Sequence, residues 1–66
     1  MGNVLVTGSC GQLGTELRLL TRGRKSFLFT DAVPSEGVAA LDICDPAAVE
    51  AFCVSHRVKA IVNCAA

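Results

Sequence analysis

Three glycines within seven residues place the strongest constraint on how this chain can fold. Gly8, Gly11 and Gly14 have the spacing G-x-x-G-x-x-G. They begin directly after a short apolar run, Asn3–Thr7, and continue into the start of an amphipathic run, Gly11–Arg22. A glycine-rich turn that joins a strand directly to a helix is far more specific than glycine spacing alone. A tight turn without a ligand is the alternative interpretation.

Each glycine of this turn has a physical role in a phosphate-binding loop. Gly8 would permit the sharp turn out of the strand, and Gly11 would let a phosphate approach the main chain. Gly14 would let the helix lie close to the sheet. The amides of Gln12 and Leu13 would lie in the first helical turn, where helix N-termini bind anions. The turn therefore predicts a site for a dinucleotide pyrophosphate.

Apolar runs of strand length alternate with amphipathic segments along the rest of the chain. The pattern predicts strands at 3–7, 26–30 and 60–64, and helices at 11–22 and from 46 to about 56. Asp45 followed by Pro46 is a typical helix start. In the first helix, Leu13, Leu17 and Leu20 are spaced to form one buried face. This order predicts an α/β fold with a parallel sheet and right-handed crossovers.

Asp31 closes the second predicted strand, at the place where dinucleotide-binding folds carry an acidic residue. A carboxylate here can accept hydrogen bonds from the hydroxyls of the adenosine ribose. Its charge would repel a 2′-phosphate, which favours NAD over NADP. A nearby arginine, such as Arg22 or Arg24, would reduce that preference. An ordinary turn aspartate is the alternative interpretation.

Two further segments are weaker candidates for ligand contact. Asp42 and Ile43 could hold the polar edge and the face of an adenine ring, or could form a solvent-facing loop. Asn63, Ala65 and Ala66 lie at the C-terminal end of the last predicted strand, where small residues leave room for a ligand at the carboxyl edge of the sheet. A turn of small residues is the alternative there.

Composition excludes several other classes of function. Six basic residues balance six acidic ones, so the charge indicates neither a nucleic-acid nor a membrane partner. No apolar run approaches the roughly 20 residues of a membrane span, and the N-terminus does not resemble a signal peptide. We therefore expect a cytoplasmic location.

The cysteines do not predict a metal site. Cys10, Cys44, Cys53 and Cys64 lack the close spacing of zinc ligands, and His56 is the one histidine. With no targeting segment to suggest secretion, disulfides are not expected either. We expect reduced and mostly buried thiols.

These motifs together resemble the extended short-chain dehydrogenase/reductase family and, within it, the dTDP-4-dehydrorhamnose reductases. The segments that carry the resemblance are Val6–Gly8, Gly11–Leu17, Leu41–Ile43 and Ile61–Ala66. The Gly-Gln-Leu-Gly core with the following Glu-Leu is the most discriminating of them. The likeness extends over essentially the whole chain, but over only about the first quarter of such an enzyme.

The resemblance implies a Rossmann-type NAD(P)-binding domain with sheet order 3-2-1-4-5-6. Residues 1–66 would be its N-terminal β-α-β-α-β part, in order 3-2-1, with the C-terminal half and the substrate domain outside the chain. The far side of the first strand would then stay unpaired, which leaves an edge open to self-association. The implied activity is NADH- or NADPH-dependent reduction of the 4-keto group of a dTDP-deoxyhexose, which yields dTDP-rhamnose for cell-surface polysaccharide.

The family's cofactor contacts can be transferred to this chain residue by residue. Pyrophosphate contacts fall on Gly11, Gln12 and Leu13, the ribose contact on Asp31, adenine contacts on Asp42 and Ile43, and further cofactor contacts on Ala65 and Ala66.

The family's catalytic residues have no counterpart in this chain. Such reductases use a Ser or Thr with a Tyr-x-x-x-Lys pair, and this sequence contains no tyrosine. Neither Lys25 nor Lys59 can complete the pair. We therefore predict no catalytic residue and no turnover by the chain alone, with the nucleotide sugar bound by later segments. The alternatives are a segment of a nucleotide-sugar epimerase or dehydratase, a segment of a regulatory subunit of the methionine adenosyltransferase type, or a self-standing binding module.

Overall fold

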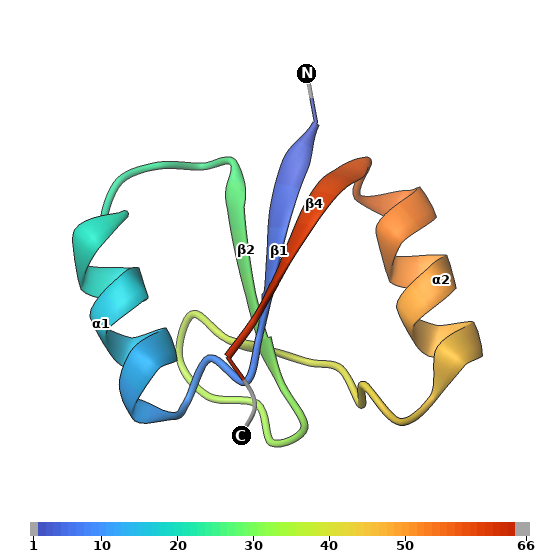
Figure 1. The fold of residues 1–66 in the computed structure, drawn as a ribbon, viewed down its shortest axis with the longest axis horizontal. Coiled ribbons are helices and arrows are strands. Elements are labelled where there is room, and N and C mark those ends of the chain that lie inside the picture. The colour runs from blue at the N-terminus through green and yellow to red at the C-terminus, as the bar shows by residue number, and fades with distance from the viewer. Residues whose placement is uncertain (1, 65–66) are drawn as a thin grey trace.

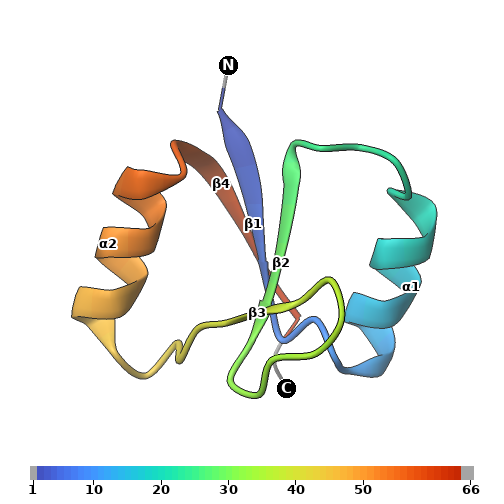
Figure 2. The same cartoon turned by 180° about the vertical axis from the view of Figure 1, so that it is seen from behind.

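A computed structural model describes residues 2–64 of the chain. Its elements, in chain order, are β1 (Asn3–Thr7), α1 (Gln12–Leu20), β2 (Phe27–Asp31), β3 (Ala39–Ala40), α2 (Pro46–Ser55) and β4 (Val58–Asn63). The sheet is seen edge-on in the centre of Figure 1, with α1 on one face and α2 on the other. Figure 2 shows the same two layers from behind. The fold is thus a sheet with a helix on each face, as the alternation of runs predicts.

The ends of α2 follow directly from its sequence. The Asp45 carboxylate accepts a hydrogen bond from the Ala48 amide at 3.2 Å, and Pro46 opens the helix. This satisfies one of the first-turn amides that lack a helical acceptor. At the other end, the His56 amide donates to the Phe52 carbonyl, and the two rings stack with centroids 4.0 Å apart. The predicted start of this helix is confirmed.

The four strands form one parallel sheet in the order β3-β2-β1-β4. A Rossmann-type fold is therefore confirmed. The order third-second-first also holds when the observed strands are numbered along the chain. The third place, however, is taken by the short strand Ala39–Ala40. The run predicted at 60–64 is instead β4, which begins at Val58 and pairs along the whole of β1.

The prediction that the far side of β1 stays unpaired is therefore wrong. Right-handed crossovers place a helix on one face when the chain steps one way across a sheet, and on the other face when it steps back. The chain steps from β1 to β2 through α1 and continues to β3, then steps back over β2 and β1 through α2 to reach β4. β1 becomes an interior strand, which is consistent with the complete burial of Leu5 and Val6. Among the described residues, the long edge strand of the sheet is β4, and the opposite edge is the two-residue strand β3.

The predicted leucine face of α1 is also wrong. Leu13 and Leu20 are 60% and 81% exposed, and Leu17 is half-buried. The residues of this segment that are buried are Gly14 in the helix and Thr21 at its C-cap. The helix is rotated because Gly14 must contact the preceding loop closely, and this requirement overrides the leucine spacing.

All four cysteines are free thiols. Cys10 and Cys44 are exposed, while Cys53 and Cys64 are half-buried. The expectation of mostly buried thiols is therefore wrong, because Cys10 and Cys44 lie in loops rather than on packed faces. None of the helices within residues 2–64 is long and apolar enough to cross a membrane.

Candidate functional site

The strand order places a topological switch point between β1 and β4. From β1 the chain leaves over one face of the sheet through α1, and β4 is reached over the other face through α2 (Figure 1). Connections that diverge in this way open a crevice at the carboxyl ends of the two strands, and open α/β sheets bind ligands there. Gly8 follows β1 and Asn63 ends β4. The structure thus brings two predicted site segments to the same edge.

Two buried hydroxyl groups fix the glycine-rich loop to the sheet. Ser9 Oγ donates to the Val6 carbonyl at 3.0 Å and accepts from the Thr30 amide at 3.0 Å. Thr30 Oγ1 donates to the same carbonyl at 2.9 Å, and the Ser9 amide donates to the Thr30 carbonyl at 3.0 Å. Both side chains are fully buried. A fully satisfied buried network of this kind holds a backbone rigidly, so the loop is preformed.

The three loop glycines differ in what the fold demands of them. Gly8 has φ +67°, a left-handed conformation that suits the predicted turn. A Cβ on Gly14 would lie 2.6 Å from Ser9 Cα and 2.8 Å from the Gly8 carbonyl oxygen, so no side chain fits. A Cβ on Gly11 would meet no atom closer than 3.5 Å, and its φ of −77° is open to any residue. Packing within the protein therefore does not require a glycine at position 11. The approach of a phosphate to the main chain would require one.

Asp31 joins the glycine-rich loop to the end of β2. Its Oδ2 accepts from the Cys10 amide at 2.9 Å, and its Oδ1 accepts from the Ala32 amide at 2.7 Å. The Cys10 amide is the main cause that lowers the pKa of the Asp31 carboxyl below its ordinary value, against a smaller opposing effect of burial. The group is therefore ionised near neutral pH. The Val33 amide and the Cys10 thiol also contribute to the lowered pKa of this carboxyl. A carboxylate is an acceptor with about four lone-pair sites, so a hydroxyl donor would share it with these groups.

A surface pocket of about 200 Å³ brings four of the predicted site residues together: Gly8, Asp31, Asp42 and Ile43. These residues come from three segments that are far apart in the sequence. Asp42 Oδ1 accepts from the Cys44 amide at 2.9 Å, which fixes the turn at the pocket wall. The pocket is smaller than the roughly 300–1,000 Å³ of typical ligand sites, and its size suits one end of an extended ligand.

Several residues that build this site were not predicted from the sequence. Ala32, Leu41 and Cys44 also line the pocket, and Ser9 and Thr30 hold the loop beside it. Their sequence signals are weak. A serine inside a glycine-rich turn and a threonine before a strand-end aspartate are both common in exposed loops. Only their complete burial in the structure reveals the role.

The remaining predicted residues lie outside this pocket. Gln12 and Leu13 form the exposed first turn of α1, and the N-cap Gly11 provides no side chain to accept from the first-turn amides. Those amides are therefore available to an anion or to water.

The other end of the predicted site lies across β1. Asn63 Oδ1 accepts from Thr7 Oγ1 at 2.9 Å, which ties the ends of β4 and β1 together. Ala65 and Ala66 lie outside the described residues. A ligand that contacted all of these predicted positions would have to extend along the carboxyl edge of the sheet.

Solved structures similar to this chain include dehydrogenases and a reductase. A partial-consensus L-threonine 3-dehydrogenase superposes with a TM-score of 0.85 at 27% identity, over 97% of this chain and 22% of that chain. A dTDP-4-dehydrorhamnose reductase from Sulfolobus tokodaii, described as hypothetical, gives 0.75 at 33% identity, over 97% and 24%. L-threonine dehydrogenase from Clostridium difficile gives 0.81 at 24% identity, over 96% and 23%, and shows the fold alone.

The chain spans less than a quarter of each of these structures. Among curated proteins no significant match is found. The family model described as the RmlD substrate binding domain matches residues 2–66. This match and the likeness to the Sulfolobus tokodaii protein confirm the resemblance to dTDP-4-dehydrorhamnose reductases inferred from the motifs. The chain therefore belongs to the family of the RmlD substrate binding domain.

Proposed function

We propose that this chain is the N-terminal, cofactor-binding part of an NAD(P)H-dependent reductase. We further propose that this enzyme reduces the 4-keto group of dTDP-4-dehydro-6-deoxy-L-mannose, a step of dTDP-rhamnose synthesis. The observation that carries the proposal is the pocket in which Gly8, Asp31, Asp42 and Ile43 meet beside a preformed glycine-rich loop. The family match and the 33% identity to a dTDP-4-dehydrorhamnose reductase support the choice of substrate.

In this proposal the chain's residues hold the adenosine half of the cofactor. Asp31 accepts hydrogen bonds from the ribose hydroxyls, and Asp42 and Ile43 contact the edge and face of the adenine. The amides of Gln12 and Leu13, at the positive end of α1, hold the pyrophosphate. The bound nicotinamide would supply a hydride to the substrate carbonyl.

The charge of Asp31 favours NADH over NADPH. The Cys10 amide lowers the pKa of this carboxyl, so the group carries a full negative charge at neutral pH. A 2′-phosphate placed against the ribose hydroxyls would lie next to that charge and be repelled. Arg22 or Arg24 would reduce this preference if either guanidinium reached the 2′-phosphate.

In this proposal the chain supplies cofactor binding without chemistry. It contains no tyrosine and therefore lacks the proton donor on which such reductases depend. Later segments of the enzyme would supply the catalytic tyrosine and lysine and the nucleotide-sugar site. A cytoplasmic location follows from the proposed substrate class and belongs to the same proposal.

Titration of the 66-residue chain with NADH, followed by nicotinamide fluorescence, tests the cofactor site. Asp31→Ala is expected to weaken NADH binding about tenfold, because hydrogen bonds to charged groups contribute about 1.5–3 kcal/mol. Glu50→Ala removes the same charge from the exposed side of α2 and should leave the affinity unchanged. Absence of NADH binding, or equal losses in both variants, would contradict the proposed site.

The likeness to an L-threonine 3-dehydrogenase, at a TM-score of 0.85, supports a second candidate substrate class. Assays of the protein encoded by the whole reading frame, with dTDP-4-dehydrorhamnose and with L-threonine, separate the two. Turnover of the nucleotide sugar with net consumption of NAD(P)H also excludes an epimerase or a dehydratase, since neither consumes reduced cofactor overall. A protein that binds cofactor but turns over neither substrate would favour the regulatory-subunit alternative.

A further inference from the structure

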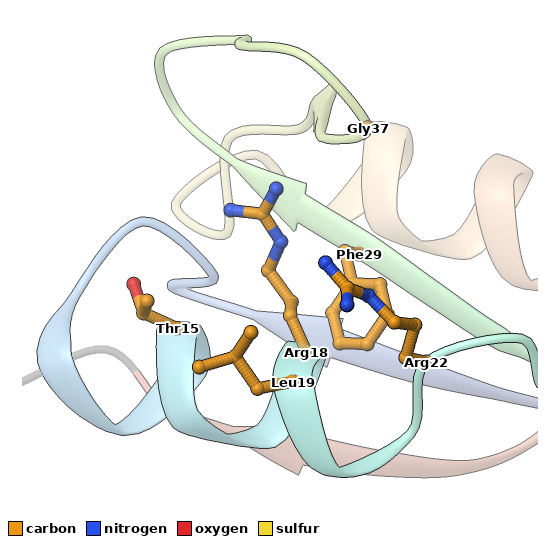
Figure 3. Close-up of a pocket in the computed structure, with 6 residues that line it drawn as sticks. All are labelled: Thr15, Arg18, Leu19, Arg22, Phe29 and Gly37. Carbon is orange, nitrogen blue, oxygen red and sulfur yellow. The ribbon is translucent and has the colours of Figure 1, made fainter.

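A second pocket, of about 370 Å³, lies between α1, β2 and the loop that carries Gly37 (Figure 3). Its lining residues are Thr15, Arg18, Leu19, Arg22, Phe29 and Gly37. None of them lines the pocket around Asp31. The proposed function gives this pocket no role, although it is the larger of the two.

Two guanidinium groups face this pocket. Arg18 is on α1 and Arg22 is in the turn that follows the helix, and both side chains line the pocket. Figure 3 shows both side chains extending past the ring of Phe29, with Arg18 reaching toward the Gly37 loop. Arg18 Nη2 donates to the Glu36 carbonyl oxygen at 3.0 Å. This contact with a neutral acceptor positions the guanidinium and leaves its charge and its other N–H donors available.

The surroundings of these arginines are basic. Four of the six lysines and arginines of the chain lie within residues 18–25, a segment that contains no acidic residue. They are Arg18, Arg22, Arg24 and Lys25. The C-terminal end of a helix carries only about half a negative charge, which does not neutralise them. Glu36 stands next to Gly37 in the facing loop, but the four basic residues outnumber it, so the pocket attracts anions.

The floor of the pocket is apolar. The half-buried ring of Phe29 lies beside the arginines (Figure 3), and Leu19, which also lines the pocket, is 63% exposed. In Figure 3 the stem of Arg18 lies between Phe29 and Leu19. The ring, the leucine and this stem together offer an apolar surface on which a planar group can pack. The pocket thus combines two positively charged guanidinium groups with apolar lining residues.

We infer that this pocket binds a phosphate monoester that carries a planar apolar group. Arg18 and Arg22 hold the phosphate, and Phe29 and Leu19 pack against the apolar group. A phosphate monoester carries a charge of about −1.5 to −2 near neutral pH, which matches two guanidinium groups. Guanidinium forks also bind phosphate in a bidentate manner. A carboxylate has one charge and matches the pair less well.

Titration of the ¹⁵N-labelled 66-residue chain with three probes, followed by amide chemical shifts, tests the site. Phenyl phosphate is expected to shift the amides of Thr15, Leu19 and Gly37. Inorganic phosphate lacks the apolar group, benzoate lacks the second charge, and both should bind more weakly. Added salt should weaken phenyl phosphate binding, since the attraction is between charges at a surface.

Matched variants separate a built site from general surface charge. Arg22→Gln should weaken phenyl phosphate binding about tenfold, because it removes a charge-assisted hydrogen bond. Arg24→Gln removes the same charge from a residue that does not line the pocket, and should change the affinity less than about twofold. Leu19→Glu, which places a carboxylate in the pocket, should abolish binding, while Leu20→Glu should not. Leu19 and Leu20 are 63% and 81% exposed, so neither side chain is needed for packing within the protein.

Three results would overturn the inference: no shifts at the lining residues, equal losses from Arg22→Gln and Arg24→Gln, or equal binding of benzoate and phenyl phosphate. The outcome does not depend on the proposed cofactor site. Asp31→Ala, which impairs the proposed NADH site, should leave phenyl phosphate binding unchanged. Failure of one proposal can therefore be told from failure of the other.

Discussion

Gly11 and Gly14 differ in what surrounds them, and this difference can separate folding from binding. A Cβ on Gly14 would lie 2.6 Å from Ser9 Cα and 2.7 Å from the Ser9 carbonyl oxygen, which are main-chain atoms that cannot move aside cheaply. Gly14→Ala is therefore expected to lower the free energy of unfolding by about 1–3 kcal/mol. Urea unfolding followed by circular dichroism measures the loss. A change below about 0.5 kcal/mol would show that the loop can yield.

Gly11→Ala should have the opposite profile. Because the nearest atom to an added Cβ is 3.5 Å away, stability should change by less than about 0.5 kcal/mol. The added methyl group would nevertheless occupy the space that the proposed pyrophosphate needs, so NADH binding should weaken. Fluorescence titration of this variant measures the effect. Unchanged NADH affinity in a folded Gly11→Ala chain would mean that the pyrophosphate does not approach the main chain at this position.

The Asp31 carboxylate gives stability a pH dependence of known sign. The Cys10 amide lowers its pKa in the folded chain below the ordinary value of 3.8. The stabilisation is therefore fully present well above pH 3.8, and is lost as the pH falls through the lower pKa of the folded state. Urea unfolding of wild type and Asp31→Asn should show a difference at pH 7 that shrinks in strong acid. A difference that grew on acidification would contradict the assigned cause.

At the scale of elements, the start of α2 depends on one side chain. The Asp45 carboxylate accepts from the Ala48 amide at 3.2 Å. Asp45→Ala should cost about 1 kcal/mol of stability, while Asp45→Asn, which keeps an acceptor, should cost only a fraction of that. Thermal or urea unfolding compares the two variants. Equal losses would mean that the charge of Asp45, rather than its cap, supports the helix.

The long strands of the sheet could be predicted from the sequence, whereas the short strand β3 and the place of β4 in the sheet could not. The runs Asn3–Thr7 and Phe27–Asp31 are strands within one residue of the prediction, because buried parallel strands have a dense apolar sequence. The sequence predicts no strand at Ala39–Ala40, because two alanines carry no strand signal. This short strand pairs with Thr30 and Asp31 and so takes the place beside β2. The strand Val58–Asn63 then pairs with the far side of β1.

At the scale of the whole molecule, the edge formed by β4 remains open in the described chain. Ile61 and Val62 are 53% and 39% exposed on this strand, and Lys59 is its single charge. Exposed apolar edge strands recruit other strands. We therefore expect the 66-residue chain to self-associate, with a sedimentation coefficient that rises with concentration. Ile61→Lys should reduce this association.

Leu20→Lys is the matched control for this edge. Leu20 is more exposed than Ile61 but lies at the end of α1, away from β4. Sedimentation velocity should show self-association in this variant similar to that of wild type. A wild-type chain that stays monomeric at every concentration would contradict the role of the edge, and an equal effect of both lysines would point to net charge instead.

The sequence alone determined the alternation of strands and helices, the glycine-rich turn and Asp31 as the strand-end carboxylate. These are local signals, since periodicity, capping and turn chemistry act over a few neighbouring residues. Only the tertiary structure decided that β4 pairs with β1, that Ser9 and Thr30 are buried, and that α1 turns Leu13 outward. Those outcomes depend on contacts between segments far apart in the chain, such as the pairing of β1 with β4, and on close packing such as the clash that any side chain at Gly14 would make with the preceding loop. No local pattern encodes them.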